Sequence, residues 1–157
     1  MSVTNGRDLR IEIGALATDQ DDADGYALPE LDNNSVAIKS TILLATSCSL
    51  SVSGDMLESA TKDDAGKWKS KVLSGLTATL THSGLLSINN TAIQSHWDKL
   101  VAGTEFYWSF TTGAANSTIF SGKGIFTGMS IDAGDLQNST LELPIEVTGP
   151  VQCVIVS

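Results

Sequence analysis

Hydrophobic and polar residues alternate in two segments near the middle of the chain. In residues 47–53 a cysteine, a leucine and a valine alternate with four serines. In residues 76–83 three aliphatic residues and His82 alternate with three threonines and a serine. A period of two is typical of a strand that buries one of its faces. The pattern predicts two strands, each with one apolar face and one face of hydroxyl side chains.

The segment between these strands, about residues 54–75, is a long polar connection. It contains four of the chain's nine basic residues, together with Trp68. A compact domain rarely has so long a connection unless the connection binds something. We therefore expect an arm that binds another copy of the same chain. The residues expected to make these contacts are Asp55, Met56, Leu57, Lys62, Asp63, Asp64, Lys67, Trp68, Lys69 and Lys71.

The other segments predict a mainly β chain with a single helix. Residues 89–102 place apolar side chains near helical spacing, with Asn89 or Asn90 as the N-cap and Gly103 as the stop. Together the elements predict an antiparallel β-sandwich or a partly closed barrel with one flanking α-helix. Strand patterns cover residues 8–15, 36–46, 104–112, 117–133, 139–149 and 151–157.

Two features inside these strand patterns predict irregular pairing. Gly122, Gly124 and Gly128 interrupt residues 117–133, and glycines within a strand often mark bulges or bends. Pro144 has no N–H to donate to a neighbouring strand, so we expect an edge or a bulge there.

Length and composition predict a single domain. A chain of 157 residues is long enough to bury its own core. We expect residues 1–7 to be a flexible leader and 150–157 a C-terminal extension. No apolar run approaches the length that spans a bilayer, and the amino terminus does not resemble a signal peptide.

The formal net charge of −9 argues against binding to polyanions. Nucleic-acid binding through phosphates needs clustered Lys and Arg, and anionic membranes attract basic surfaces. Cys48 and Cys153 lie in apolar strand patterns, so buried free thiols are favoured over a disulfide.

An acidic segment, residues 18–34, raises the question of a calcium site. If Gly25 takes the sixth position of an EF-hand loop, Leu31 falls where the bidentate glutamate belongs, so the motif fails. A solvated acidic loop is favoured over a metal site, and we expect no metal and no cofactor.

No group of residues has the spacing of a catalytic site. His82 and His96 lie on a strand and on the helix, where a structural role is favoured. No serine stands in a G-x-S-x-G motif, and the glycines of residues 121–128 match neither a P-loop nor a dinucleotide-binding turn. We therefore expect a protein that is not an enzyme.

The order of the segments resembles the major tail tube proteins of long-tailed bacteriophages over about residues 6–149. In that family the arm begins with a serine/threonine-rich stretch, continues with a Lys-Asp pair and Gly-x-Trp, and ends with a Ser-Gly entry into an alternating strand. A helix, an aromatic strand and a Ser-Gly-Lys-Gly strand come after it. The matching positions are Gly6-Arg7-Asp8-Leu9, Ser59–Thr61, Lys62-Asp63-Asp64, Gly66-Lys67-Trp68, Ser74-Gly75 and Ser121–Gly124. The acidic segment 18–34 is longer than the family pattern, and the apolar segment after Thr148 is an addition to it.

The resemblance implies a structural virion protein that assembles with itself in the host cytoplasm. Six copies would form a ring, rings would stack into a tail tube with other tail proteins at its ends, and DNA would pass through the lumen without specific binding. Trp68 would anchor the arm in a neighbour, and the arm lysines would face an acidic surface. The side chains expected to face the lumen are Ser47, Ser49, Ser51, Ser53, Thr77, Thr79 and Thr81.

Two alternatives also fit these patterns. A tube protein of a contractile injection or secretion system would have the same architecture. A monomeric β-sandwich that binds carbohydrate would use exposed aromatic rings, for which Trp97, Trp108 and Tyr107 are the candidates. Against the second alternative, Trp97 and Trp108 fall on faces that the pattern predicts to be buried.

Overall fold

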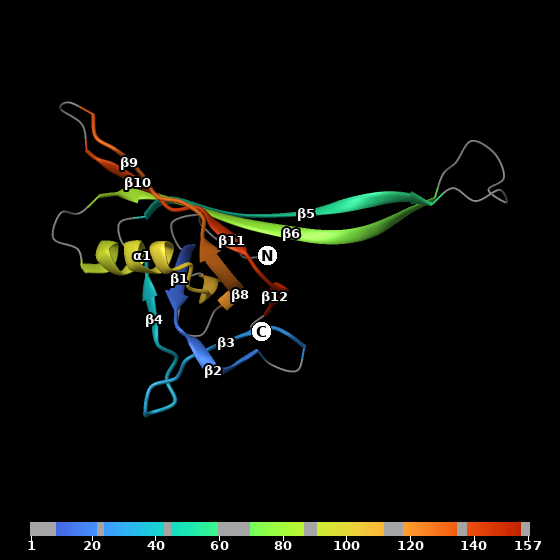
Figure 1. Cartoon of the computed structure of the whole chain (residues 1–157), viewed down its shortest axis with the longest axis horizontal. Helices are drawn as coiled ribbons and strands as arrows, with labels where there is room; N and C mark the ends of the chain where they lie inside the picture. Colours follow the sequence, from blue (N-terminus) through green and yellow to red (C-terminus); the bar gives the residue numbers. More distant parts are fainter. Residues whose placement is uncertain are drawn as a thin grey trace, which may run out of the picture.

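The computed structural model describes residues 9–21, 24–42, 45–59, 70–86, 91–111, 118–134 and 138–154 (Figure 1). The described part is mostly β-strand, with one helix. Its strands are β1 (Arg10–Gly14), β2 (Leu16–Asp21), β3 (Ala27–Pro29), β4 (Lys39–Thr41), β5 (Ala45–Ser59), β6 (Ser70–Leu85), β7 (Phe106–Thr111), β8 (Thr118–Phe126), β9 (Ser130–Asp132), β10 (Thr140–Glu142), β11 (Ile145–Val147) and β12 (Gln152–Cys153), and its helix is α1 (Thr91–Ala102).

Ten of these strands form one antiparallel sheet. Its order is β4-β1-β7-β8-β11-β6-β10-β9, with β12 added to β8 and β5 added to β6, while β2 and β3 form a separate pair. Within the described residues the end strands β4 and β9 do not pair with each other, so the sheet does not close into a barrel. The predicted mainly β, antiparallel fold with one helix is confirmed, in its open form.

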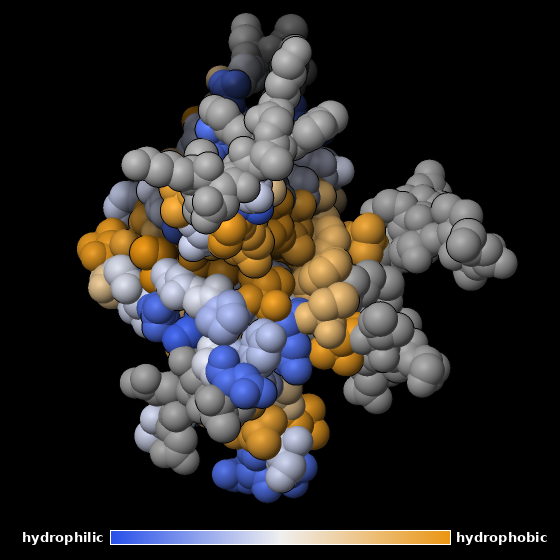
Figure 2. All heavy atoms as spheres, turned by 90° about the vertical axis from the view of Figure 1, so that its right-hand side faces the viewer, coloured by the Kyte–Doolittle hydropathy of each residue, from blue (hydrophilic) through white to orange (hydrophobic). Residues whose placement is uncertain are grey.

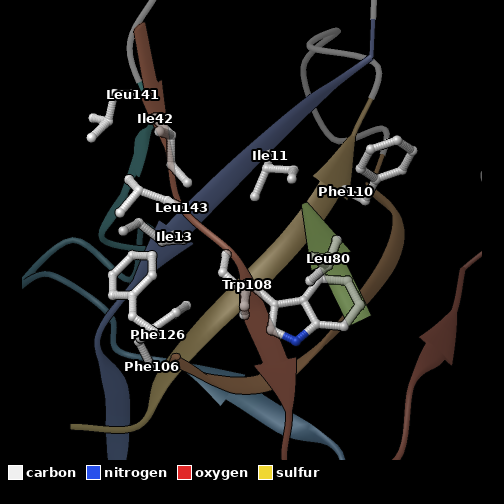
Figure 3. Close-up of a cluster of buried hydrophobic side chains, with 11 residues drawn as sticks. Ile11, Ile13, Ile42, Leu80, Phe106, Trp108, Phe110, Phe126, Leu141 and Leu143 are labelled. Carbon is white, nitrogen blue, oxygen red and sulfur yellow. The ribbon is translucent and has the colours of Figure 1, made fainter. Parts of the chain in front are cut away.

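The hydrophobic core lies between two parts of this sheet (Figure 3). β1, β7 and β8 supply one side, with Phe106 and Trp108 fully buried, and β6, β10 and β11 supply the other, with Leu80 fully buried. The indole N–H of Trp108 donates to the carbonyl oxygen of Lys123 at 2.9 Å, so the buried ring leaves no polar atom unpaired. The prediction that Trp108 is buried is confirmed.

Gly122 and Gly124 make room for the indole ring of Trp108. A Cβ atom at Gly122 would lie 3.1 Å from Cζ2 of that ring, and one at Gly124 would lie 2.8 Å from Cγ2 of Ile145 and 2.9 Å from the carbonyl oxygen of Glu146. β8 pairs with β7 in regular register through both glycines. Of the predicted bulges or bends, a bulge in the pairing with β7 is wrong for these two positions. Glycine is needed there because a side chain would collide with its neighbours.

We expect Gly124→Ala to destabilise the monomer by about 1–3 kcal/mol, because the added methyl group meets a backbone carbonyl that cannot move aside. Gly75→Ala is the matched control, since a Cβ there has no atom within 4 Å. Urea unfolding of both variants measures the difference. Equal stability of the two variants would contradict this account of the glycines.

Helix α1 begins and ends close to the prediction. Gly103 has φ 62°, the left-handed conformation that ends a helix, and Leu100 and Lys99 accept hydrogen bonds from the N–H groups of Gly103 and Thr104 at 3.2 and 3.1 Å. The predicted N-cap residues 89 and 90 lie outside the described residues.

One face of α1 packs on the sheet. His96 is buried there, with its ring centroid 5.5 Å from that of Phe126. Trp97 is 53 % exposed, so the prediction of a buried Trp97 is wrong. It follows His96 by one residue, about 100° around the helix, and its side chain turns away from the sheet.

Three further segments differ from the prediction. The acidic segment 18–34 is not one loop, because β2 and β3 pair within it and β3 packs against β7 and β8. The pattern at 36–46 yields the three-residue strand β4 before β5 begins at Ala45. The strand predicted at 139–149 is divided into β10 and β11, with Pro144 between them, so the irregularity predicted at Pro144 as an edge or a bulge is a break in the strand.

Candidate functional site: a projecting hairpin with two unlike faces

The hairpin of β5 and β6 projects far beyond the body of the molecule (Figure 1). Its strands have 15 and 16 residues and pair from Ala45 and Gly84 out to Ser59 and Ser70. The prediction that the strands end near residues 53 and 76 is wrong, because backbone pairing continues through much of the predicted arm. The outermost part, residues 60–69, lies outside the described residues.

One face of the hairpin is lined with hydroxyl groups. The hydroxyls of Ser49 and Thr81 lie 2.7 Å apart across the two strands, and those of Ser53 and Thr77 lie 3.1 Å apart. All the predicted lumen-facing side chains are exposed and share this face. They are Ser47, Ser49, Ser51, Ser53, Thr77, Thr79 and Thr81. The result is an uncharged polar strip along the hairpin.

The opposite face is apolar and only partly covered. Leu80 is fully buried against the body, whereas Val52 and Leu76 on the same face are 52 % and 67 % exposed. The alternation predicted that all three would be half-buried or buried. The prediction is wrong for Val52 and Leu76 because the body ends while the hairpin continues. This exposed apolar face, the underside, is typical of a contact surface.

A β-bulge changes the pattern farther out. The pairing shifts between Asp55 and Met56, and Ser74 donates its hydroxyl to the carbonyl oxygen of Asp55 at 3.0 Å. Leu73 lies on the underside with Leu76, since both approach the position of a Cβ at Gly54. Their neighbours in the alternation, Leu57 and Val72, point to the other face.

A groove of about 670 Å³ separates the underside from the body. Val52 and Leu76 line it from the hairpin, and Phe120, Val147 and Val151 line it from the body. Figure 2 shows hydrophobic residues gathered across this side of the molecule. Cys153, an exposed free thiol, also lines the groove, whereas Cys48 is half-buried. The prediction of two buried thiols is therefore wrong for Cys153.

Both long edges of the hairpin are open among the described strands. β5 pairs only with β6, so its other edge is free along its length. β6 pairs with β10 and β11 only at its inner half, from Thr79 to Leu85, so its edge is free along residues 70–78. Unpaired N–H and C=O groups in such a row are ready to pair with another chain.

The predicted arm residues are only partly described. Asp55, Met56, Leu57 and Lys71 lie exposed on the outer half of the hairpin. Lys62, Asp63, Asp64, Lys67, Trp68 and Lys69 lie outside the described residues, so the anchor role of Trp68 stays a prediction.

The buried titratable groups have structural surroundings. Burial lowers the pKa of His82, and burial together with the positive charges of Lys99 and His82 lowers the pKa of His96 to about 4. Glu12 is buried and forms ion pairs with Arg10 at 2.9 Å and Lys39 at 2.8 Å. None of these groups opens onto the groove.

Two kinds of feature are absent from the described residues. They contain no group of three His, Cys, Asp or Glu side chains placed to hold a metal ion. No helix within them is long and apolar enough to cross a membrane.

Comparison of the sequence with known proteins gives no relatives. No protein-family model matches the chain. No curated protein matches it either.

Comparison of the structure gives tail tube proteins. The chain is similar to a chain in the tail of an empty gene transfer agent particle refined with C6 symmetry (TM-score 0.72, 13 % identity, covering 98 % of this chain and 100 % of that one). It is similar to the SPP1 tail tube subunit (TM-score 0.62, 10 % identity, 98 % and 81 %). A sheath/tube terminator of an extracellular contractile injection system, PVC, is less similar (TM-score 0.51, 13 % identity, 92 % and 94 %). The chain therefore shares its fold with proteins of phage-like tails.

Proposed function

We propose that the chain is a tail tube subunit of a phage-like particle, a structural protein without catalytic activity. It assembles with itself into rings, and the rings stack into a tube through which DNA passes. The single observation that carries this proposal is the projecting hairpin, which has a wet hydroxyl face, an exposed apolar underside and two open edges. The shared fold supports the same conclusion.

The open edges favour a ring. When two hairpins lie side by side and point the same way, β6 of one copy runs antiparallel to β5 of the next. Edge-to-edge pairing of this kind joins the copies into one continuous sheet and leaves no free edge once the ring closes. Six copies is the number we propose, following the C6 symmetry of the similar gene transfer agent tail.

The hydroxyl face suits the lumen of such a tube. Serine and threonine side chains keep the wall hydrated and present no cations to the phosphates of DNA. The net charge of −9 on each copy also keeps DNA from binding to the wall, since it repels a passing duplex. The same arrangement places the apolar underside toward protein. The particle would carry the subunit in its tail, after assembly in the host cytoplasm.

Electron microscopy of the purified protein tests the proposal. We expect rings or tubes with a central channel, and sedimentation that shifts to large species as the concentration rises. A protein that stays monomeric at every accessible concentration, with no rings or tubes in the images, would overturn the proposed function. A monomer that instead binds a glycan array would favour the carbohydrate-binding alternative.

A further inference from the structure

Helix α1 is held on the sheet through a titratable side chain. Among the side chains of α1 that the structure describes, only His96 is fully buried, at 4 % exposure, while Ile93, Lys99 and Leu100 are half-buried. Ile93, His96 and Leu100 follow one another at helical spacing, so they form the stripe that faces the sheet. The centre of this stripe is an imidazole, where an aliphatic side chain is usual.

On the sheet side, the imidazole of His96 meets one end of the hydrophobic core. Its centroid lies 5.5 Å from that of the Phe126 ring on β8, and the Phe126 centroid lies 4.6 Å from that of Phe106 on β7. Figure 3 shows Phe106 and Phe126 next to each other at one end of the cluster. Buried His82 on β6 is near enough for its charge to act on His96. The helix therefore covers this end of the core through His96.

The described groups around His96 favour the neutral imidazole. Its own helix contributes the positive charge of Lys99, and β6 contributes His82. Cys48 on β5 lies opposite His82 in the strand pairing, and burial raises the pKa of its thiol, so the thiol is uncharged in acid. Nδ1 of each histidine is buried and has no hydrogen-bond partner among the described residues. A proton on His96 would thus add a charge that no described group compensates.

Little else in the described part of α1 holds it on the sheet. A helix of 12 residues is marginal in water by itself, so its order depends on packing. Trp97 and Val101 are 53 % and 69 % exposed and add little to that packing. The sheet has its own core, in which all six residues of β7 are buried. An element with few buried apolar contacts can open while the rest of a domain stays folded.

We propose that α1 is an acid-released cover of one end of the core. When the imidazole of His96 takes up a proton from solvent, the helix leaves the sheet and the ring of Phe126 becomes exposed, while the strands stay paired. The released imidazole keeps the proton because water replaces its apolar surroundings. The release takes place within one chain, so it does not depend on the proposed tube.

Hydrogen exchange of the full chain in dilute solution tests the release between pH 7.5 and 4.5. The pKa of His96 is about 4 in the docked helix and returns to about 6.5 in the released one. The ratio of released to docked helix should therefore rise by about 70-fold over this range. We expect the protection of the α1 amides, corrected for the intrinsic pH dependence of exchange, to fall by that factor. The β7 amides should stay better protected than the α1 amides at every pH.

Low urea separates release of the helix from unfolding of the whole chain. Release exposes little surface, so urea below the unfolding transition should leave exchange of the α1 amides nearly unchanged. Exchange of the β7 amides needs global unfolding and should accelerate in the same solutions. If the amides of α1 and β7 exchange at the same rate and respond equally to urea, the helix opens only with the whole chain and the proposal is overturned.

His96→Leu removes the titratable group and keeps the centre of the stripe apolar. We expect the protection of its α1 amides to lose the 70-fold response to pH. Combining His96→Leu with Trp97→His is the matched control, because it moves the histidine to the exposed face of the same helix, and the response should stay absent. His96→Gln, which is also neutral throughout, replaces His96→Leu if leucine does not fit. A response equal to that of the natural protein in these variants would overturn the role of His96, whether or not the protein forms tubes.

Discussion

Leu76→Asp is expected to abolish ring formation at concentrations where the natural protein assembles, while the monomer stays folded. Leu76 is 67 % exposed in the monomer, so its replacement removes little that stabilises the body. In the proposed ring the side chain would be buried, which would contribute about 1.5–3 kcal/mol, and an unpaired carboxylate in its place would add a further penalty. A loss of about 3 kcal/mol per contact weakens association by a factor of at least about 100.

Sedimentation velocity across a concentration series, with electron microscopy of the same samples, measures this loss. The matched control is Ile131→Asp, which also replaces a half-exposed aliphatic residue but lies on β9, away from the underside. We expect the control to assemble like the natural protein. Normal tubes from Leu76→Asp would show that the underside is not an interface. Equal loss in both variants would point to net charge rather than to position.

The free energy of unfolding is expected to fall as the pH falls from about 6.5 toward 4, because of His96. A histidine in an unfolded chain titrates near pH 6.5, whereas burial and the nearby charges of Lys99 and His82 lower the pKa of His96 to about 4. Between these values the unfolded chain binds the extra proton, so acid favours unfolding. The stability that is present above pH 6.5 is therefore lost by about pH 4, at a cost of roughly 2–3 kcal/mol.

The surroundings of His96 explain why the proton is costly. Among the described residues, the Phe126 ring contacts it, and the charges that act on it come from Lys99 and His82, both of which disfavour a second positive charge. Nδ1 of His96 and Nδ1 of His82 are buried and have no hydrogen-bond partner among the described residues. Burial lowers the pKa of His82 as well, so both rings favour the neutral form.

Urea unfolding at several pH values from about 7.5 to 4.5 measures the effect, with His96→Gln as the comparison. Glutamine does not titrate, so the pH dependence of the variant should be shallower by the contribution of His96. The carboxylates contribute equally to both proteins and cancel in the difference. Parallel curves for the two proteins would show that His96 does not couple stability to pH.

Much of the fold follows from local patterns that the backbone geometry sets. In a strand, neighbouring side chains point to opposite faces, so the alternation of residues 47–53 and 76–83 reveals which residues share a face whatever lies around them. The same holds for the stop of α1 at Gly103, since a left-handed residue after a helix favours glycine. Predictions of this kind, including the hydroxyl face of the hairpin, are confirmed.

The solvent exposure of a side chain cannot be predicted from the local sequence pattern, because it depends on contacts between distant segments. The alternation shows that Val52, Leu76 and Leu80 share a face, but Leu80 is buried and the other two are exposed because the body ends between them. The long polar connection hid further strand, since Leu57 and Val72 depart from the alternation and the bulge at Ser74 shifts its register. The groove joins β8, the segment after β11 and the hairpin, which no single stretch of sequence brings together.

The properties of the hairpin therefore have two physical origins. Its faces and hydroxyl strip come from residue-by-residue chemistry, which acts over a few positions and is visible in the chain. Its reach beyond the body, the exposed underside and the groove beneath it come from long-range packing, which exists only once the strands have paired.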